Sequence, residues 1–273
     1  MTSRHSKPQV TYLACGRNCA PWIERSLTSL IRQRDTEWRA VVVDDASTDG
    51  SPDVIRRVTA SDPRFTLLAS EERRFGLRSR IEAARVAMAS GAEVLVALDL
   101  DDWLLGRGVN GHLTRLYEDP ALWITYGSFR RWRPERRLLR LRPKRSPSRG
   151  YREEEFLAGG LRRAPWLGTH LRSWRAGLMR RLDPAWLQGD QGEELTSCED
   201  MALMLPMLEM AGPGHARFVQ RALYAYNCHG GTIVRSRRGE QVRIEEMLRG
   251  RRSVCALEQL DEGAPALAGA WPR

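Results

Sequence analysis

Three carboxylates stand within four residues at Asp99, Asp101 and Asp102, directly after the apolar segment Val94–Leu98. Such a cluster is costly at the end of a buried strand, because like charges repel and desolvation disfavours the ionised form. A divalent cation removes this cost, and Mg²⁺ and Mn²⁺ prefer carboxylate oxygens while keeping coordination places for phosphate. Alternate residues of an extended backbone point the same way, so Asp99 and Asp101 are predicted to face one ligand. The alternative is an acidic turn in which Asp102 caps a helix.

A second acidic cluster follows another apolar segment, at Asp44, Asp45 and Asp49. A carboxylate at this place can accept a hydrogen bond from a nucleobase N–H group or from a ribose hydroxyl. The alternative is a strand-to-helix turn with Ser51 as the helix N-cap. Considered without its neighbours, this cluster favours the turn.

The elements that must position these clusters alternate between strand and helix. Strands are predicted at Val10–Ala14, Ala40–Val43, Phe65–Leu68 and Val94–Leu98, and helices after Pro21, after Ser51 and over Leu77–Ala89. This order is typical of a doubly wound α/β fold with a mostly parallel sheet. Both acidic clusters follow strands, and ligands bind at the carboxyl edge of such sheets.

The pattern is looser after Asp102. The remaining predicted elements are helices over Gly108–Tyr117, Ser197–Met210 and Val242–Leu257, strands over Leu122–Tyr126 and Ala216–Tyr226, a ribbon or loop near Leu138–Leu141, and a loose tail at Gly263–Arg273. Pro206 is expected to bend or shorten the helix that contains it.

Composition places the chain among globular proteins. It has 273 residues, of which 42% are hydrophobic and 29% charged, which suits one large α/β domain or two small ones. Apolar runs fall short of the ~20 residues that cross a bilayer, and Met1–Pro8 lacks the apolar core of a signal peptide. Five cysteines without a Cys-x-x-Cys pair are expected to be reduced thiols, with neither a zinc site nor a disulfide framework. We therefore expect a cytoplasmic protein.

Positive charge is concentrated in one strip. Residues 130–152 hold eleven Lys and Arg against one Glu, which equals the formal net charge of +10 for the whole chain. A local basic strip indicates contact with anions, either phosphates, an acidic acceptor or the anionic inner face of a membrane. The equally weighted alternative is a solvated arginine-rich loop.

Four segments, taken in order, resemble glycosyltransferase family 2. Val41–Gly50 is similar to the Val-Val-Asp-Asp-Gly-Ser-Thr-Asp segment of that family, and Leu98–Asp102 to its Leu-Asp-Ala-Asp-Asp. Cys198–Leu203 resembles its Glu-Asp-x-x-Leu motif, and Tyr224–Thr232 its late Tyr/His/Gly-Ser segment. The resemblance covers roughly residues 8 to 240.

The resemblance implies a GT-A fold, in which helices flank a Rossmann-like, mostly parallel sheet. Residues 1–260 would form one glycosyltransferase domain, with a nucleotide-binding half at 8–103 and an acceptor half at 104–260, followed by a loose tail at 261–273. The implied activity is inverting transfer of a sugar from a nucleoside-diphosphate sugar, with a UDP-sugar the expected donor. The acceptor is unidentified, and the basic strip suggests an anionic acceptor or peripheral membrane contact.

Residue roles follow from the resemblance by position. Asp45 would bind the nucleobase with Asp44 nearby, and Asp99 and Asp101 would meet the ribose and the Mn²⁺ or Mg²⁺ ion on the diphosphate. Asp200 would be the catalytic base with Glu199 beside it. The last assignment is His229, near the diphosphate or the metal.

Two segments depart from the family pattern. After the first strand, only Asn18 matches the family's Pro-Thr-Tyr-Asn, and only Gly76 holds its place in Asn-x-Gly-x-x-x-Ala-Arg-Asn. Arg74 and Arg78 are the candidates for nucleotide contact, with Arg80 left as a further option. A nucleotidyltransferase is disfavoured because the first strand lacks a Gly-rich phosphate loop. The remaining alternative is a degenerate GT-A scaffold without transferase activity that binds nucleic acid or a membrane through the basic strip.

Overall fold

A computed structural model describes residues 7–133, 145–147, 149–228 and 238–261. Within these ranges one mixed sheet runs in the order β3-β2-β1-β4-β8-β6-β9-β5, and β7 pairs with β6. The strands are β1 (Val10–Gly16), β2 (Trp38–Asp45), β3 (Phe65–Ser70), β4 (Val94–Asp99), β5 (Trp103–Leu104), β6 (Ile124–Trp132), β7 (Arg145–Ser146), β8 (Ser173–Arg175) and β9 (Ala216–Asn227).

The first four strands form the parallel part of the sheet. β1 lies between β2 and β4, and its residue Gly16 is in register with Asp44, just as Cys15 is in register with Asp99. β2 is apolar on both faces, because Val41 and Val43 pack into one buried cluster and Val42 packs into the other. Helices must therefore cover both faces, as in other parallel sheets.

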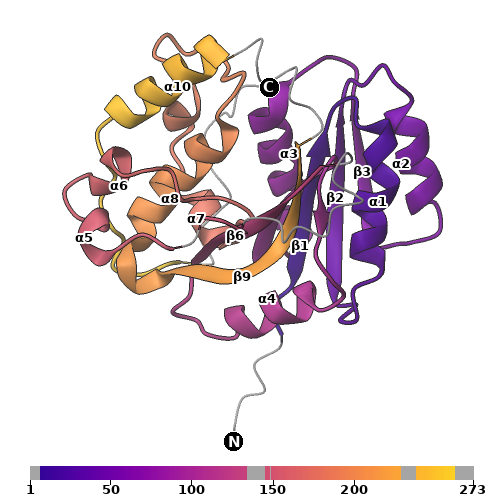
Figure 1. The fold of residues 1–273 in the computed structure, drawn as a ribbon, viewed down its shortest axis with the longest axis horizontal. Coiled ribbons are helices and arrows are strands. Elements are labelled where there is room, and N and C mark those ends of the chain that lie inside the picture. The colour runs from indigo at the N-terminus through magenta and orange to yellow at the C-terminus, as the bar shows by residue number, and fades with distance from the viewer. Residues whose placement is uncertain (1–6, 134–144, 148, 229–237, 262–273) are drawn as a thin grey trace, which may run out of the picture.

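Helices cover the sheet on both sides. Figure 1 shows α1 and α2 on one side of β1–β3 and α3 on the other. The helices are α1 (Ala20–Ile31), α2 (Ser51–Thr59), α3 (Phe75–Ala89), α4 (Val109–Tyr117), α5 (Glu153–Phe156), α6 (Gly160–Arg163), α7 (Ala176–Arg180), α8 (Glu199–His215) and α10 (Arg238–Gly250), with a 3₁₀ turn at Pro184–Leu187. No helix in the described ranges is long and apolar enough to cross a membrane.

The second half of the chain extends the same sheet with strands that run in both directions. β8 runs antiparallel to β4 and to β6, and β9 runs parallel to β6 with a register shift between Gly127 and Phe129. β5, which follows the acidic loop, pairs antiparallel with β9. The sheet is thus continuously parallel over β3-β2-β1-β4 and again between β6 and β9, and the acidic ends of β2 and β4 lie at the carboxyl edge of the first part.

Two predicted helices need correction. α8 continues through Pro206 to His215, so the prediction that Pro206 shortens the helix is wrong, and the kink of this helix is at Gly212 and not at Pro206. Residues 201–212 of α8 are all buried, so packing on every side holds the helix across the missing N–H group. The predicted helix Val242–Leu257 instead begins at Arg238 and ends at Gly250. The predictions for Leu138–Leu141 and for the tail at Gly263–Arg273 fall outside the described residues.

Candidate active site

The end of β2 presents two buried carboxylates in opposite directions. Asp45 Oδ1 accepts a hydrogen bond of 2.6 Å from the backbone N–H of Arg74, just before α3. Asp44 Oδ2 accepts one of 3.1 Å from the N–H of Ser47, which closes the turn after the strand. Ser51 is not the N-cap of α2, because that position is Gly50 with φ +82°. The turn is therefore built around Asp44, and Asp45 faces the α3 side.

Asn18 ties the loop after β1 to the loop after β2. Its side-chain Oδ1 accepts a hydrogen bond of 2.8 Å from the N–H of Thr48, and its own N–H donates to Ser47 Oγ at 2.9 Å. Asn18 has φ +53°, a left-handed conformation that Asn tolerates better than most residues. The Asn matched from the family pattern thus holds two loops of the carboxyl edge together.

The acidic loop after β4 is fixed at both of its ends. The N–H of Leu100 donates to the carbonyl of Cys15 on β1 at 3.0 Å. At the other end, Asp102 is buried and accepts a hydrogen bond of 2.7 Å from the N–H of Asn227. The side-chain amide of Asn227 donates to the carbonyl of Asp101 at 3.1 Å. Asp102 therefore anchors the end of β9 and does not cap a helix.

Arg80 lies beneath the acidic loop and is 2% exposed. Its guanidinium donates to the carbonyls of Leu13 at 2.6 Å and Leu98 at 3.0 Å, which are on β1 and β4. It also forms ion pairs with Asp99 Oδ1 and, at 2.8 Å, with Glu199 Oε1. One buried cation thus joins the acidic loop to the start of α8.

The start of α8 brings Glu199 and Asp200 against the acidic loop. Glu199 packs against the first turn of α3, where a Cβ at position 76 would overlap its carboxylate, so a side chain there would displace Glu199. Asp200 Oδ2 accepts a hydrogen bond of 3.1 Å from Trp166 Nε1. Arg172 lies 3.6 Å from Asp200 Oδ2 and 3.6 Å from Asp99 Oδ2, and it forms a second cationic link between the two segments.

Charge in this cluster is unevenly compensated. Burial favours the neutral form of Asp99, but the charges of Arg80 and Arg172 outweigh burial and hold its pKa below the usual range. Burial, followed by repulsion from Asp99, raises the pKa of Asp101 to about 6. Burial and the charge of Asp101 raise the pKa of Asp102 well above its usual value. The carboxylates outnumber the cations, and a bound cation would relieve the difference.

Three potential metal ligands gather beside β4. Ligand atoms of Asp99, Asp102 and His170 lie within 4.8 Å of one another. Burial, together with the nearby charge of Arg172, lowers the pKa of His170 to about 3, so its imidazole is neutral as a metal ligand must be. Two carboxylates and an imidazole suit Mn²⁺, so the residues present fit such an ion.

The metal ligands expected from the sequence overlap this set only in part. Asp99 is common to both, and the assignment of Asp101 stays a prediction. His229 lies outside the described residues.

Of the three arginines considered for the nucleotide, Arg80 alone reaches the acidic cluster. Arg74 pairs with Glu82 at 2.7 Å, and Arg78 pairs with Glu194. Both line a separate pocket between α3 and residues 184–195. Arg74 contributes to the carboxyl edge through its backbone N–H, and Arg78 has its ion pair with Glu194 at that pocket.

Sequence reasoning missed four side chains that contact the cluster, namely Trp166, His170, Arg172 and Tyr224. The hydroxyl of Tyr224 accepts a hydrogen bond of 3.1 Å from the backbone N–H of Asp99, and the ring of Tyr224 is stacked on that of His170. Tyr224 belonged to a matched motif but had no role assigned. The other three come from residues 166–172, where no acidic or glycine pattern signals a site.

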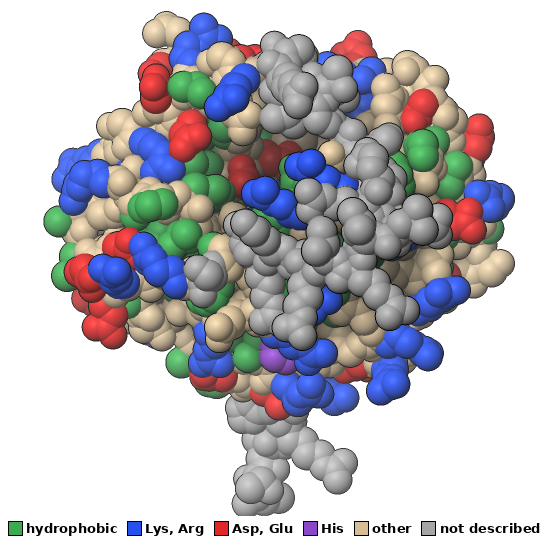
Figure 2. Space-filling model, in the orientation of Figure 1, with side chains coloured by type: hydrophobic (Ala, Val, Ile, Leu, Met, Phe, Trp, Pro, Cys, Tyr) green, Lys and Arg blue, Asp and Glu red, His purple; other side chains and the backbone are tan. Residues whose placement is uncertain are grey.

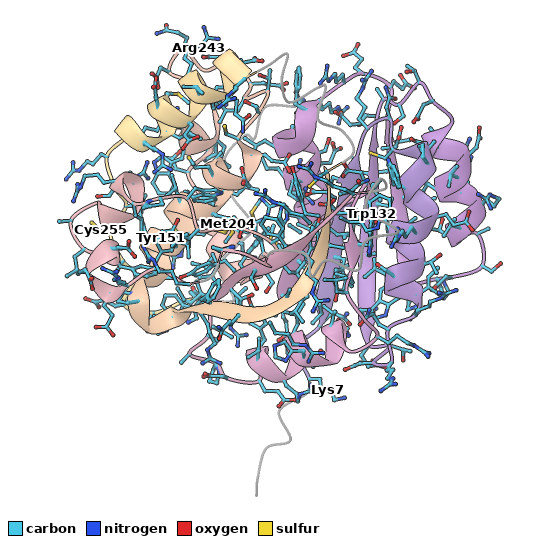
Figure 3. All side chains as sticks on the ribbon, in the orientation of Figure 1. Lys7, Trp132, Tyr151, Met204, Arg243 and Cys255 are labelled. Carbon is cyan, nitrogen blue, oxygen red and sulfur yellow. The ribbon has the colours of Figure 1, made fainter. Side chains whose placement is uncertain are left out.

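The surface around the cluster is hollowed. Figure 2 shows acidic side chains deep in a hollow near the middle of the face, with basic side chains beside them. Beyond the far end of the acidic loop, Trp132 ends β6 on the side of the sheet nearest α1 (Figure 3), and its ring packs edge-on against Trp22 and Trp103.

A parallel sheet with paired carboxylates at its carboxyl edge, extended by mixed strands and met by a second acidic segment at the start of α8, defines a GT-A type of fold. Solved structures agree. Mannosyltransferase PcManGT from Pyrobaculum calidifontis, in complex with GDP-Man and Mn²⁺, is 20% identical with a TM-score of 0.59, over 92% of this chain and 67% of that one. TarS of S. aureus in complex with UDP-GlcNAc is 16% identical with a TM-score of 0.57, over 81% and 58%.

The family model for glycosyl transferase family 2 matches residues 14–181, and the chain belongs to this family. Chondroitin synthase of Pasteurella multocida (strain Pm70) is 28% identical over 152 residues, which are 56% of this chain. Hyaluronan synthase of Pasteurella multocida is 28% identical over 149 residues, or 55% of this chain. In each case the match spans 14% of the relative's length.

Proposed function

We propose that the protein transfers a sugar, with inversion, from a nucleoside-diphosphate sugar to an acceptor hydroxyl. The observation that carries the proposal is the convergence of acidic residues from separate segments at one edge of the sheet. Arg80 and Arg172 join Asp99 to Glu199 and to Asp200. The similarity to transferases solved with UDP-GlcNAc and GDP-Man supports a nucleotide-sugar donor, for which a UDP-sugar remains our expectation.

The donor would lie along the carboxyl edge of β1, β2 and β4. Asp45 uses Oδ1 to accept the N–H of Arg74, which leaves Oδ2 for a nucleobase donor. Asp99 and Asp101 lie at the place where ribose and diphosphate would pass. A Mn²⁺ or Mg²⁺ ion bound there would offset the negative charge that develops on the leaving diphosphate.

Asp200 is the proposed base. It lies at the first turn of α8, beside the positive end of the helix dipole. Its carboxylate would take the proton of the acceptor hydroxyl as that oxygen attacks the anomeric carbon, and a base of this kind contributes ~10²–10⁴-fold. The transition state would be oxocarbenium-like, by analogy with glycoside hydrolysis.

Two variants test the proposal with UDP- and GDP-sugars in the presence of Mn²⁺. Asp200→Asn should abolish transfer and keep nucleotide affinity in calorimetry, and near-normal turnover would remove the assignment of the base. Asp101→Ala should lose the Mn²⁺-dependent part of nucleotide affinity. Unchanged affinity in that variant would remove Asp101 from the metal site.

A further inference from the structure

The two oxygens of Asp200 have different surroundings. Oδ2 receives the indole N–H of Trp166 at 3.1 Å and lies 3.6 Å from the guanidinium of Arg172. No hydrogen bond to Oδ1 occurs among the described residues. A carboxylate oxygen that already accepts donors is a poorer proton acceptor than its free neighbour, so the two oxygens are chemically distinct.

The loop that carries Trp166 is held firmly from both sides. The N–H of Leu167 donates to the hydroxyl of Tyr151 at 2.9 Å. Thr169 exchanges hydrogen bonds with Gly127 of β6, with its hydroxyl at 2.8 Å from the carbonyl and its own carbonyl at 3.1 Å from the N–H. The indole N–H therefore reaches Asp200 from an anchored backbone.

Gly168 leaves the space that the indole ring occupies. A Cβ at position 168 would lie 2.6 Å from Cη2 of Trp166, closer than real carbon atoms approach. The backbone of Gly168 is outside the left-handed region, so alanine can adopt it without strain. The contact between Trp166 and Asp200 thus depends on Gly168, because a larger residue there would displace the indole ring.

We propose that Trp166 is a positioning residue, which holds Oδ2 of Asp200 and leaves Oδ1 to receive the proton of the acceptor. This inference rests on the proposed function, in which Asp200 is the base. Without the indole donor the carboxylate could rotate about its Cβ–Cγ bond, and either oxygen would face the acceptor only part of the time. Precise orientation of a base is a large part of its effect on the rate.

The test compares Trp166→Phe and Gly168→Ala with the wild type. Phenylalanine keeps an aromatic ring but lacks the N–H donor, whereas the Gly168→Ala substitution displaces the indole without altering its chemistry. Release of UDP from UDP-N-acetylglucosamine and of GDP from GDP-mannose, with Mn²⁺ and with water as the acceptor, measures turnover. Trp186→Phe is the matched control, because Trp186 lies in the 3₁₀ turn at Pro184–Leu187 and packs against the same core.

We expect kcat to fall about 10-fold in both variants with KM for the donor unchanged, since a hydrogen bond to a charged group is lost. The acid limb of the pH–rate profile should move to higher pH, because the ionised carboxylate loses a donor. Trp186→Phe should match the wild type in both measurements.

Two results would overturn the proposal while the proposed function stands. One is wild-type kcat in Trp166→Phe and Gly168→Ala when Asp200→Asn is inactive. The other is a loss of turnover without any displacement of the acid limb, which would assign Trp166 to packing alone. Absence of nucleotide release from the wild type with every donor would instead remove the proposed function, and this inference with it.

Discussion

Replacement of Arg80 by methionine should destabilise the protein far more than a surface arginine change. The guanidinium is 2% exposed, and its removal would leave Asp99 and Glu199 without their shared cation and two carbonyls of the sheet without a donor. Loss of one partner of a buried ion pair costs ~3–5 kcal/mol. The two carboxylates retain 24% and 25% exposure, so water can partly solvate them and the lower end of that range applies.

A loss of about 3 kcal/mol corresponds to a fall in Tm of roughly 6–10 °C for a chain of this size. Thermal unfolding followed by circular dichroism measures it, and Arg78→Met is the matched control on the same helix. Arg78 pairs with Glu194 where the side chains are 27% and 40% exposed, so its loss should cost ~0–1 kcal/mol. Equal Tm values for the two variants would refute the reasoning that Arg80 stabilises a buried acidic cluster.

Four further predictions concern the same edge of the sheet. Gly76→Ala should lower the free energy of unfolding by ~1–3 kcal/mol, because its methyl group overlaps the Glu199 carboxylate; urea denaturation with an unchanged midpoint would contradict this. Apparent Mn²⁺ affinity, measured by calorimetry, should weaken about 10-fold per pH unit below pH 6, because Asp101, a proposed ligand with a raised pKa, would have to lose a proton to bind. In the absence of metal, the folded protein binds more protons than the unfolded chain, because the pKa of Asp101 is raised on folding. The free energy of unfolding should therefore fall as pH rises from about 4 to 6. Asp45→Asn should weaken UDP binding about 10-fold, and an unaltered Kd would remove Asp45 from the nucleotide site.

The parallel half of the fold was predictable because its signals are local. Apolar β-branched runs such as Val41–Val43 end in carboxylates, and the period of Leu77–Ala89 fits one helix. The reversal after β4 was not predicted, because β8 has only three residues and its pairing with β4 and β6 is a long-range contact. Pro206 was misleading, since burial of α8 overrides a local preference.

The acidic part of the site was predictable for a different reason. Asp45 and Asp99 end strands and Asp200 lies in the first turn of α8, and their type and place indicate ligand chemistry. The residues that pair with these carboxylates belong to no motif that can be recognised in the sequence. Arg80 is one arginine among many, and Arg172 becomes informative only when β8 is placed beside β4. Which cation neutralises which carboxylate depends on tertiary packing, and a short sequence motif does not contain that information.

The contact between Glu199 and Gly76 has a consequence for how the fold handles phosphate. Many nucleotide-binding folds place a phosphate group on the amino end of a helix, where free N–H groups and the helix dipole attract an anion. In this protein the carboxylate of Glu199 already lies against the amino end of α3. The Glu199 carboxylate would repel a diphosphate from that helix end. The negative charge of the diphosphate would therefore have to be balanced by a cation at the acidic loop.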